Sequence, residues 1–193
     1  MLGEGTLILS NASTSNSFAP ASIQVDSGAT LQLAANNQIG DSTGLILNGG
    51  TFLVGTASTG FSDTLGTLTL SASSTIDLGA WTTGVRQLTF ADSSAINWTG
   101  TLTITNWQGV ANTSSDVAEI LFGTGGLTSG QLSQVYWANQ NINGGTLIGG
   151  NGELAPIPEA RVVWGAAALT AFVLWRERRR FPKLARGLLR RRL

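Results

Sequence analysis

Apolar and polar residues alternate over short segments through residues 1–105, which predicts β-strands with one buried side each. Three segments of equal length carry the pattern: 23–33, 68–78 and 88–98. When these segments are aligned, apolar residues share four columns: Ile23, Leu68 and Leu88; Val25, Leu70 and Phe90; Leu31, Ile76 and Ile96; Leu33, Leu78 and Trp98. A shorter copy covers 45–54, so that successive copies begin about 20 residues apart, at positions 23, 45, 68 and 88.

This period predicts an all-β chain whose residues 1–105 form a right-handed parallel β-solenoid (β-helix). Each repeat would make one coil, with the apolar columns stacked inward. The column of Gln32, Asp77 and Asn97 would then form a polar ladder on the outside. An antiparallel β-sandwich is the alternative, because the turn at Gly49 and Gly50 also suits a hairpin. The shared columns favour the solenoid.

Residues 106–150 depart from the repeat and are predicted to form an end cap. Strands are expected at 119–122 and 144–150, and a short helix within 127–137, where a Thr/Ser cap precedes apolar residues. A solenoid needs such an atypical unit to cover its open end. Residues 151–158 contain Gly and Pro and are predicted to be a linker.

The segment 162–175 has no charged residue and predicts a single hydrophobic α-helix near the C-terminus. Arginines follow it directly, and cations after an apolar helix stay on the cytoplasmic side of a membrane. We therefore expect residues 1–153 to lie outside the cytoplasm. The apolar membrane residues are Val162, Trp164, Leu169, Phe172, Leu174 and Trp175, and the cytoplasmic basic anchor is Arg176, Arg178, Arg179 and Arg180. The run is shorter than the roughly 20 residues of a typical span, so a removable sorting signal and a permanent anchor both fit it.

The order of motif, apolar helix and arginines over 159–180 resembles the PEP-CTERM sorting domain of bacteria. The resemblance implies that Pro158, Glu159 and Ala160 are the sorting motif and that a membrane exosortase reads it. Ala160 stands where this family usually has a second proline. The basic tail 181–193 extends beyond the family pattern. In the alternative of a plain tail anchor, this tail lies on the inner leaflet as an amphipathic segment.

Two repeat units, L-x-L-x-x-x-S-T-I at 68–76 and N-G-G-T-F at 48–52, resemble the autotransporter-associated β-strand repeats of bacterial surface proteins. This resemblance implies export. The first five residues have neither a basic nor an apolar signal region. We therefore expect a longer upstream chain to supply the signal and further repeats.

Composition excludes several classes of site. The chain has no Cys and no His, which excludes disulfides, thiol or imidazole nucleophiles and ordinary zinc sites. Residues 1–153 carry one basic and nine acidic residues, a net charge of −8, and residues 154–193 carry ten and two, or +8. The acidic part is unsuited to nucleic acid, whereas the basic part suits anionic lipids.

Three function classes remain. A structural or adhesive surface protein comes first. A module that binds extracellular polysaccharide is second, with Trp81, Trp107 and Trp137 stacking on sugar rings if they are exposed, whereas Trp98 falls in an inward column. An enzyme acting on polysaccharides comes third, because the acidic residues do not share columns: Asp26 aligns with Ser71 and Ala91. We expect no catalysis, no metal and no cofactor.

Overall fold

Short strands fill the first part of the chain in the computed structural model, which describes residues 1–11, 16–56, 59–79, 85–113, 117–157 and 173. The elements are β1 (Gly5–Leu9), β2 (Ser22–Asp26), β3 (Ala29–Leu33), β4 (Gly44–Asn48), β5 (Thr51–Val54), β6 (Asp63–Leu65), β7 (Leu68–Ala72), β8 (Ser74–Asp77), β9 (Arg86–Phe90), β10 (Leu102–Thr105), β11 (Ala118–Leu121), α1 (Ser129–Ser133), β12 (Val135–Trp137), β13 (Ile142–Asn143), β14 (Gly145–Ile148) and β15 (Glu153–Pro156). Residues Met1–Ile157 make one compact unit.

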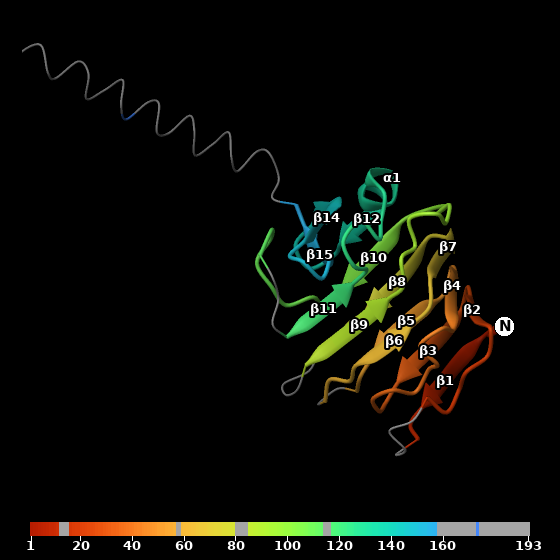
Figure 1. The fold of residues 1–193 in the computed structure, drawn as a ribbon. Helices are drawn as coiled ribbons and strands as arrows, with labels where there is room; N and C mark the ends of the chain where they lie inside the picture. Colours follow the sequence, from red (N-terminus) through yellow and green to blue (C-terminus); the bar gives the residue numbers. More distant parts are fainter. Residues whose placement is uncertain (12–15, 57–58, 80–84, 114–116, 158–172, 174–193) are drawn as a thin grey trace, which may run out of the picture. The chain divides into compact units, whose positions relative to one another are not determined.

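These strands form three sheets, and successive strands from β1 to β12 belong to different sheets (Figure 1). The three-stranded sheet has the order β2-β4-β7, the seven-stranded sheet β1-β3-β5-β8-β10-β12-β13, and the five-stranded sheet β14-β15-β11-β9-β6. Strands from successive coils pair in parallel, as β2 with β4 and β3 with β5. The chain is thus mostly β-strand, in stacked parallel coils that resemble a β-solenoid. This confirms the predicted class and excludes the antiparallel sandwich for these strands.

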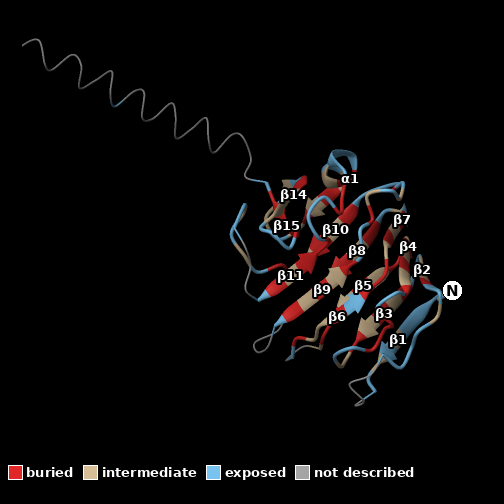
Figure 2. Cartoon of the chain, in the orientation of Figure 1, coloured by how far each residue is buried: buried red, intermediate tan, exposed pale blue. Residues whose placement is uncertain are grey.

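Alternate residues of each strand point into the coil, and the parallel register stacks them in columns. In the seven-stranded sheet, Leu31, Phe52, Ile76, Ile104 and Trp137 lie in register. In the three-stranded sheet, Ile23, Leu45 and Leu68 form one column, and Val25, Leu47 and Leu70 another. All of these residues are buried. Figure 2 shows buried segments, in red, recurring along the strands. The columns predicted for 23–33, 45–54 and 68–78 are therefore confirmed.

The third aligned copy, 88–98, was placed in the wrong columns. Leu88 and Phe90 lie in β9, which pairs with β6 and β11 in the five-stranded sheet and not with β7. Residues 91–101 form no strand, and β10 takes the expected place of Ile96 beside β8. The alternation of apolar residues is the same on all three sides of a coil, so the pattern does not reveal which side a strand joins. Trp98 is nevertheless buried, as predicted, and donates from Nε1 to the Leu68 carbonyl at 3.0 Å.

A short helix and antiparallel strands follow the parallel coils in residues 106–150, the segment expected to be an end cap. Helix α1 begins after Thr128, whose hydroxyl and backbone form a capping box with Gln131. The amide of Gln131 also donates to the carbonyls of Ser93 and Ile96 at 2.8 Å, tying the helix to the last coil. Beyond it, pairing becomes antiparallel: β12 with β13, β14 with β15, and β15 with β11. This change of direction ends the parallel stack.

Half of the segment 151–158, which was expected to be a linker, belongs to a strand. Residues Glu153–Pro156 form β15, and all four are buried. Gly152, with φ +67°, lies in the turn before β15, and Pro156 ends this strand opposite Gly145, so neither residue marks a linker here. Within the described part of the chain, no helix has the length and apolar character needed to cross a membrane. The sorting motif 158–160, the arginine anchor 176–180 and the tail 181–193 lie outside the described residues. So do the predicted membrane residues Val162, Trp164, Leu169, Phe172, Leu174 and Trp175.

Candidate functional site

The outer surface of the seven-stranded sheet carries one threonine at the same register in five consecutive strands. These residues, the threonine ladder, are Thr6, Thr30, Thr51, Thr75 and Thr103. Paired strands lie about 4.8 Å apart, so the hydroxyls repeat at that interval along the stack. Tyr136 occupies the next position, in register with Thr103. Its neighbours Val135 and Trp137 are buried while Tyr136 is half-buried, so its ring lies on the same outer surface.

A second outward column runs beside the ladder and consists of Ile8, Gln32, Leu53, Asp77 and Thr105. The predicted polar ladder of Gln32, Asp77 and Asn97 is therefore correct for two members only. Asn97 lies on the exposed segment before β10, and Leu53 separates Gln32 from Asp77. Asn106, which the column analysis did not single out, supplies the third polar side chain instead.

These side chains line a hollow of about 330 Å³ on the outer surface, with Leu53 in its lining. Asn106 donates from its amide to Asp77 Oδ1 at 2.7 Å, and the Gly79 backbone N–H donates to the same oxygen at 2.7 Å. Gln32 donates to the Gly55 carbonyl at 2.9 Å. Each amide donates one N–H to the protein, and no hydrogen bond among the described residues uses its side-chain oxygen. The hollow therefore offers hydrogen-bond acceptors to a ligand.

Arg86 lies fully buried near this hollow and holds its rim in place. Its guanidinium donates to the carbonyl of Val54 at 2.6 Å, Thr56 at 2.9 Å and Gly79 at 3.3 Å. Burial lowers the pKa of Arg86 to about 10, and the negative charge of Asp77 acts in the opposite direction. Gly55 has φ +102°, and a Cβ there would meet Arg86 Nε at 2.7 Å. A glycine is therefore required where the rim passes over the guanidinium.

Sequence reasoning did not find the role of Arg86, although a signal was present. It is the single basic residue in the first 153 positions and begins the alternating segment Arg86–Phe90. The alternation that places Leu88 and Phe90 inward also places Arg86 inward.

Asp63 is a second buried charge, away from the hollow, on the five-stranded sheet. Its Oδ2 accepts the backbone N–H of Gln38 at 2.8 Å and of Ile39 at 3.1 Å. Burial raises the pKa of Asp63 to about 6, against the lowering effect of these backbone donors. Within the described residues its Oδ1 has no hydrogen-bond partner. This carboxylate joins neighbouring coils and is enclosed by the protein.

The tryptophans predicted to stack on sugars do not form an exposed row. Trp107 and Trp137 are 5% and 1% exposed, and their rings meet edge to face with centroids 5.0 Å apart. Both rings belong to the core of the end cap, where they exclude water, so the sugar-stacking prediction is wrong for these two. Trp81 lies outside the described residues. Tyr136 is an aromatic residue that the fold brings to the outer surface of the seven-stranded sheet.

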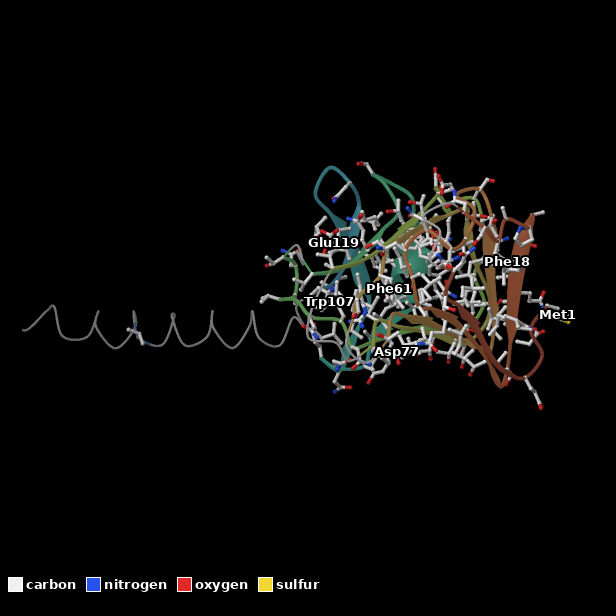
Figure 3. All side chains as sticks on the ribbon, turned by 90° about the horizontal axis from the view of Figure 1, so that it is seen from below. Met1, Phe18, Phe61, Asp77, Trp107 and Glu119 are labelled. Atoms are coloured by element: carbon white, nitrogen blue, oxygen red, sulfur yellow. The ribbon has the colours of Figure 1, made fainter. Side chains whose placement is uncertain are left out.

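Three of the acidic residues, Asp26, Asp77 and Glu119, lie on three different sheets. Asp26 is on the three-stranded sheet, where Gln24 and Asn48 donate to it and lower its pKa. Asp77 and Glu119 come from β8 and β11 of different sheets and lie apart in Figure 3. In the described part of the chain, no three acidic residues gather as they would to hold a metal ion.

Comparison with protein-family models, with curated proteins and with solved structures finds no match for this chain.

Proposed function

We propose that this chain is an exported cell-surface or extracellular-matrix protein, structural or adhesive in role. In this proposal the stacked coils form a right-handed β-solenoid, the hand that parallel crossover connections almost always take. The segment 159–180 is a sorting signal with one hydrophobic α-helix. It holds the chain in the cytoplasmic membrane until an exosortase reads Pro158 and Glu159.

The observation that carries this proposal is the in-register parallel stack with an antiparallel cap at its C-terminal end. Each coil contacts only its neighbours, so such a stack is a stiff scaffold that can present one repeated surface. The outward residues of its largest sheet are mainly neutral and polar. The charge asymmetry of the sequence adds the expectation of an outer acidic part and an inner basic part.

The test is the location of the repeats in intact cells. The chain is expressed behind an export signal in a bacterium that has an exosortase, and protease is added to spheroplasts. We expect digestion of residues 1–153, while a cytoplasmic marker protein stays intact. Full protection of the repeats in spheroplasts, with digestion after lysis, would contradict the proposal.

A module that binds extracellular carbohydrate is the second candidate. The hollow beside Asp77 favours it, because a concave site with apolar and acceptor groups suits a polyol. Polysaccharide cleavage remains the third and least supported class, since it needs paired carboxylates across one site.

A further inference from the structure

We propose that the outer surface of the seven-stranded sheet binds an uncharged, extended polysaccharide whose chain runs along the stack of coils. The binding surface consists of the threonine ladder, the hollow beside Asp77, and Tyr136 at one end. This inference deepens the adhesive part of the proposed function by naming a ligand class and a surface. It does not depend on the sorting tail.

The threonine ladder supplies the repeating contact. Thr30, Thr51, Thr75 and Thr103 are half-buried, and no hydrogen bond within the described residues uses their hydroxyls. A hydroxyl both donates and accepts, as each sugar hydroxyl does. Identical groups at about 4.8 Å intervals match a ligand that is itself a linear repeat of short units.

The hollow offers acceptors to the hydrogen-bond donors of a ligand. The amides of Gln32 and Asn106 are oriented by Gly55 and Asp77, and no hydrogen bond among the described residues uses their oxygens. Such acceptors suit the many O–H groups of a sugar. Asp77 is the one charged residue lining the hollow, and the buried Arg86 beside it offsets its charge, so the hollow has no net positive charge to attract an anionic glycan.

Tyr136 gives the surface an aromatic platform. It lies in register with the ladder, and its hydroxyl donates to Asn141 at 3.0 Å, which fixes the ring. An aromatic face packs well on the apolar face of a sugar ring. From Thr30 to Tyr136 the surface spans five strands, or about 19 Å, about the length of an extended tetrasaccharide.

Threonine is common in strands because its β-branched shape suits them, which alone could explain the ladder. The variants must therefore separate the effect of side-chain shape from that of the hydroxyl hydrogen bonds. A triple variant Thr51→Val, Thr75→Val and Thr103→Val keeps the branched shape and removes three hydroxyls. Its matched control is Thr64→Val, Thr69→Val and Thr89→Val, which makes the same change on the other two sheets. Tyr136→Ala removes the platform, and Tyr136→Phe keeps it.

The experiment titrates the full ¹⁵N-labelled chain, in detergent, with cellohexaose and follows the amide resonances. We expect shifts at Thr51, Thr75, Thr103 and Tyr136, at millimolar ligand, and weaker or no binding of coiled maltohexaose and anionic hexagalacturonate. The ladder variant and Tyr136→Ala should each raise Kd about fivefold to tenfold, while the control triple and Tyr136→Phe stay within about twofold of wild type.

The inference is overturned if none of the three probes binds, or if either comparison sugar binds as well as cellohexaose. Equal loss of affinity in the ladder and control triples, with all variants folded by circular dichroism, would also overturn it. A failure here leaves the proposed location untouched, because protease access in spheroplasts does not depend on a glycan.

Discussion

The Asp63 carboxylate accepts the backbone N–H of Gln38 at 2.8 Å, although the two residues are 25 positions apart. A side-chain oxygen at this point joins two coils, as a backbone carbonyl does elsewhere in the stack. The arrangement keeps a carboxylate 3% exposed, so its ionised form is costly.

We expect Asp63 to make the protein more stable as the pH falls from about 7 to about 4. The folded pKa of about 6 lies above the ordinary 3.8, so the folded state binds the proton more tightly. The gain begins as pH falls through the folded pKa and is complete below the unfolded one. Asp63→Asn should remove this dependence and raise the free energy of unfolding near neutral pH, by on the order of 2 kcal/mol. Urea denaturation at about pH 7.5 and about pH 4.5 measures both effects.

Asp92→Asn is the control, because Ser94 donates to Asp92 and lowers its pKa. The stability that Asp92 contributes is present above pH 3.8 and is lost as the pH falls through the lower folded pKa. This pH dependence has the opposite sign to that of Asp63. If the free energy of unfolding changes in the same way in Asp63→Asn and Asp92→Asn, burial does not destabilise the ionised form of Asp63.

Ile76→Asp should be far more damaging than Asp77→Ala. Ile76 is fully buried between Phe52 and Ile104, and an unpaired charge there should cost several kcal/mol. Asp77 faces outward but accepts from Asn106 and Gly79, so its loss should cost about 1–2 kcal/mol. Urea denaturation of both variants gives the two values. Equal losses would mean that the register of β8 is wrong.

Arg86→Lys should destabilise the domain despite keeping the charge. The guanidinium reaches carbonyls of two neighbouring coils, at Val54 and Gly79, and an ammonium has fewer donors without the planar fork. We expect a loss of about 2–4 kcal/mol from carbonyls left unpaired. Val85→Ala, at a neighbouring exposed position, should stay within about 0.5 kcal/mol of wild type. A tolerated lysine would show that the carbonyl contacts are not needed.

Trp107→Ala should cost about 3–5 kcal/mol, because the ring is packed against Trp137 in the cap. Trp107→Phe should be much milder, since it keeps a ring and removes an indole N–H that has no partner among the described residues. Thermal unfolding separates the two variants. A Trp107→Phe variant that loses binding to cellohexaose while remaining folded would show that this ring contacts sugar.

The tail can be tested by mass. In a host that has an exosortase, we expect the mature protein to lack the residues after about Glu159, as a sorting signal requires. Glu159→Ala should leave them attached. Intact-mass analysis of the purified protein distinguishes these forms. Wild type that keeps its arginine-rich end in this host would be tail-anchored, and Ala160→Pro would then test whether the missing proline is the cause.

Much of the fold follows from the sequence because inward positions repeat with the coil. Leu31, Ile76 and their neighbours were placed correctly, since one face of each strand must be apolar. The short helix after Thr128 was also predictable, because its capping box is local. Residues 88–98 were misplaced because alternation says that a strand has an inner face without saying which sheet it joins.

The candidate site was harder to predict because it depends on which strands are neighbours. Asn106 meets Asp77 across 29 positions, a contact that no local pattern contains. Tyr136 aligns with the threonine ladder only because β12 follows β10 in the sheet, beyond the end of the recognisable repeats. Sugar stacking was predicted for Trp107 and Trp137 because the sequence does not distinguish a large aromatic residue of a buried cap from one on a sugar-binding surface.

The hydrogen bonds between paired coils point along the stack, and this decides how the domain responds to mechanical load. A pull that separates the first coil from the cap loads all the interfaces between coils, and these can open one after another because each coil is bonded only to its neighbours. The domain should therefore peel open in small steps and lengthen gradually instead of rupturing at once. On a surface exposed to flow, such a stack would absorb mechanical energy by lengthening as its interfaces open.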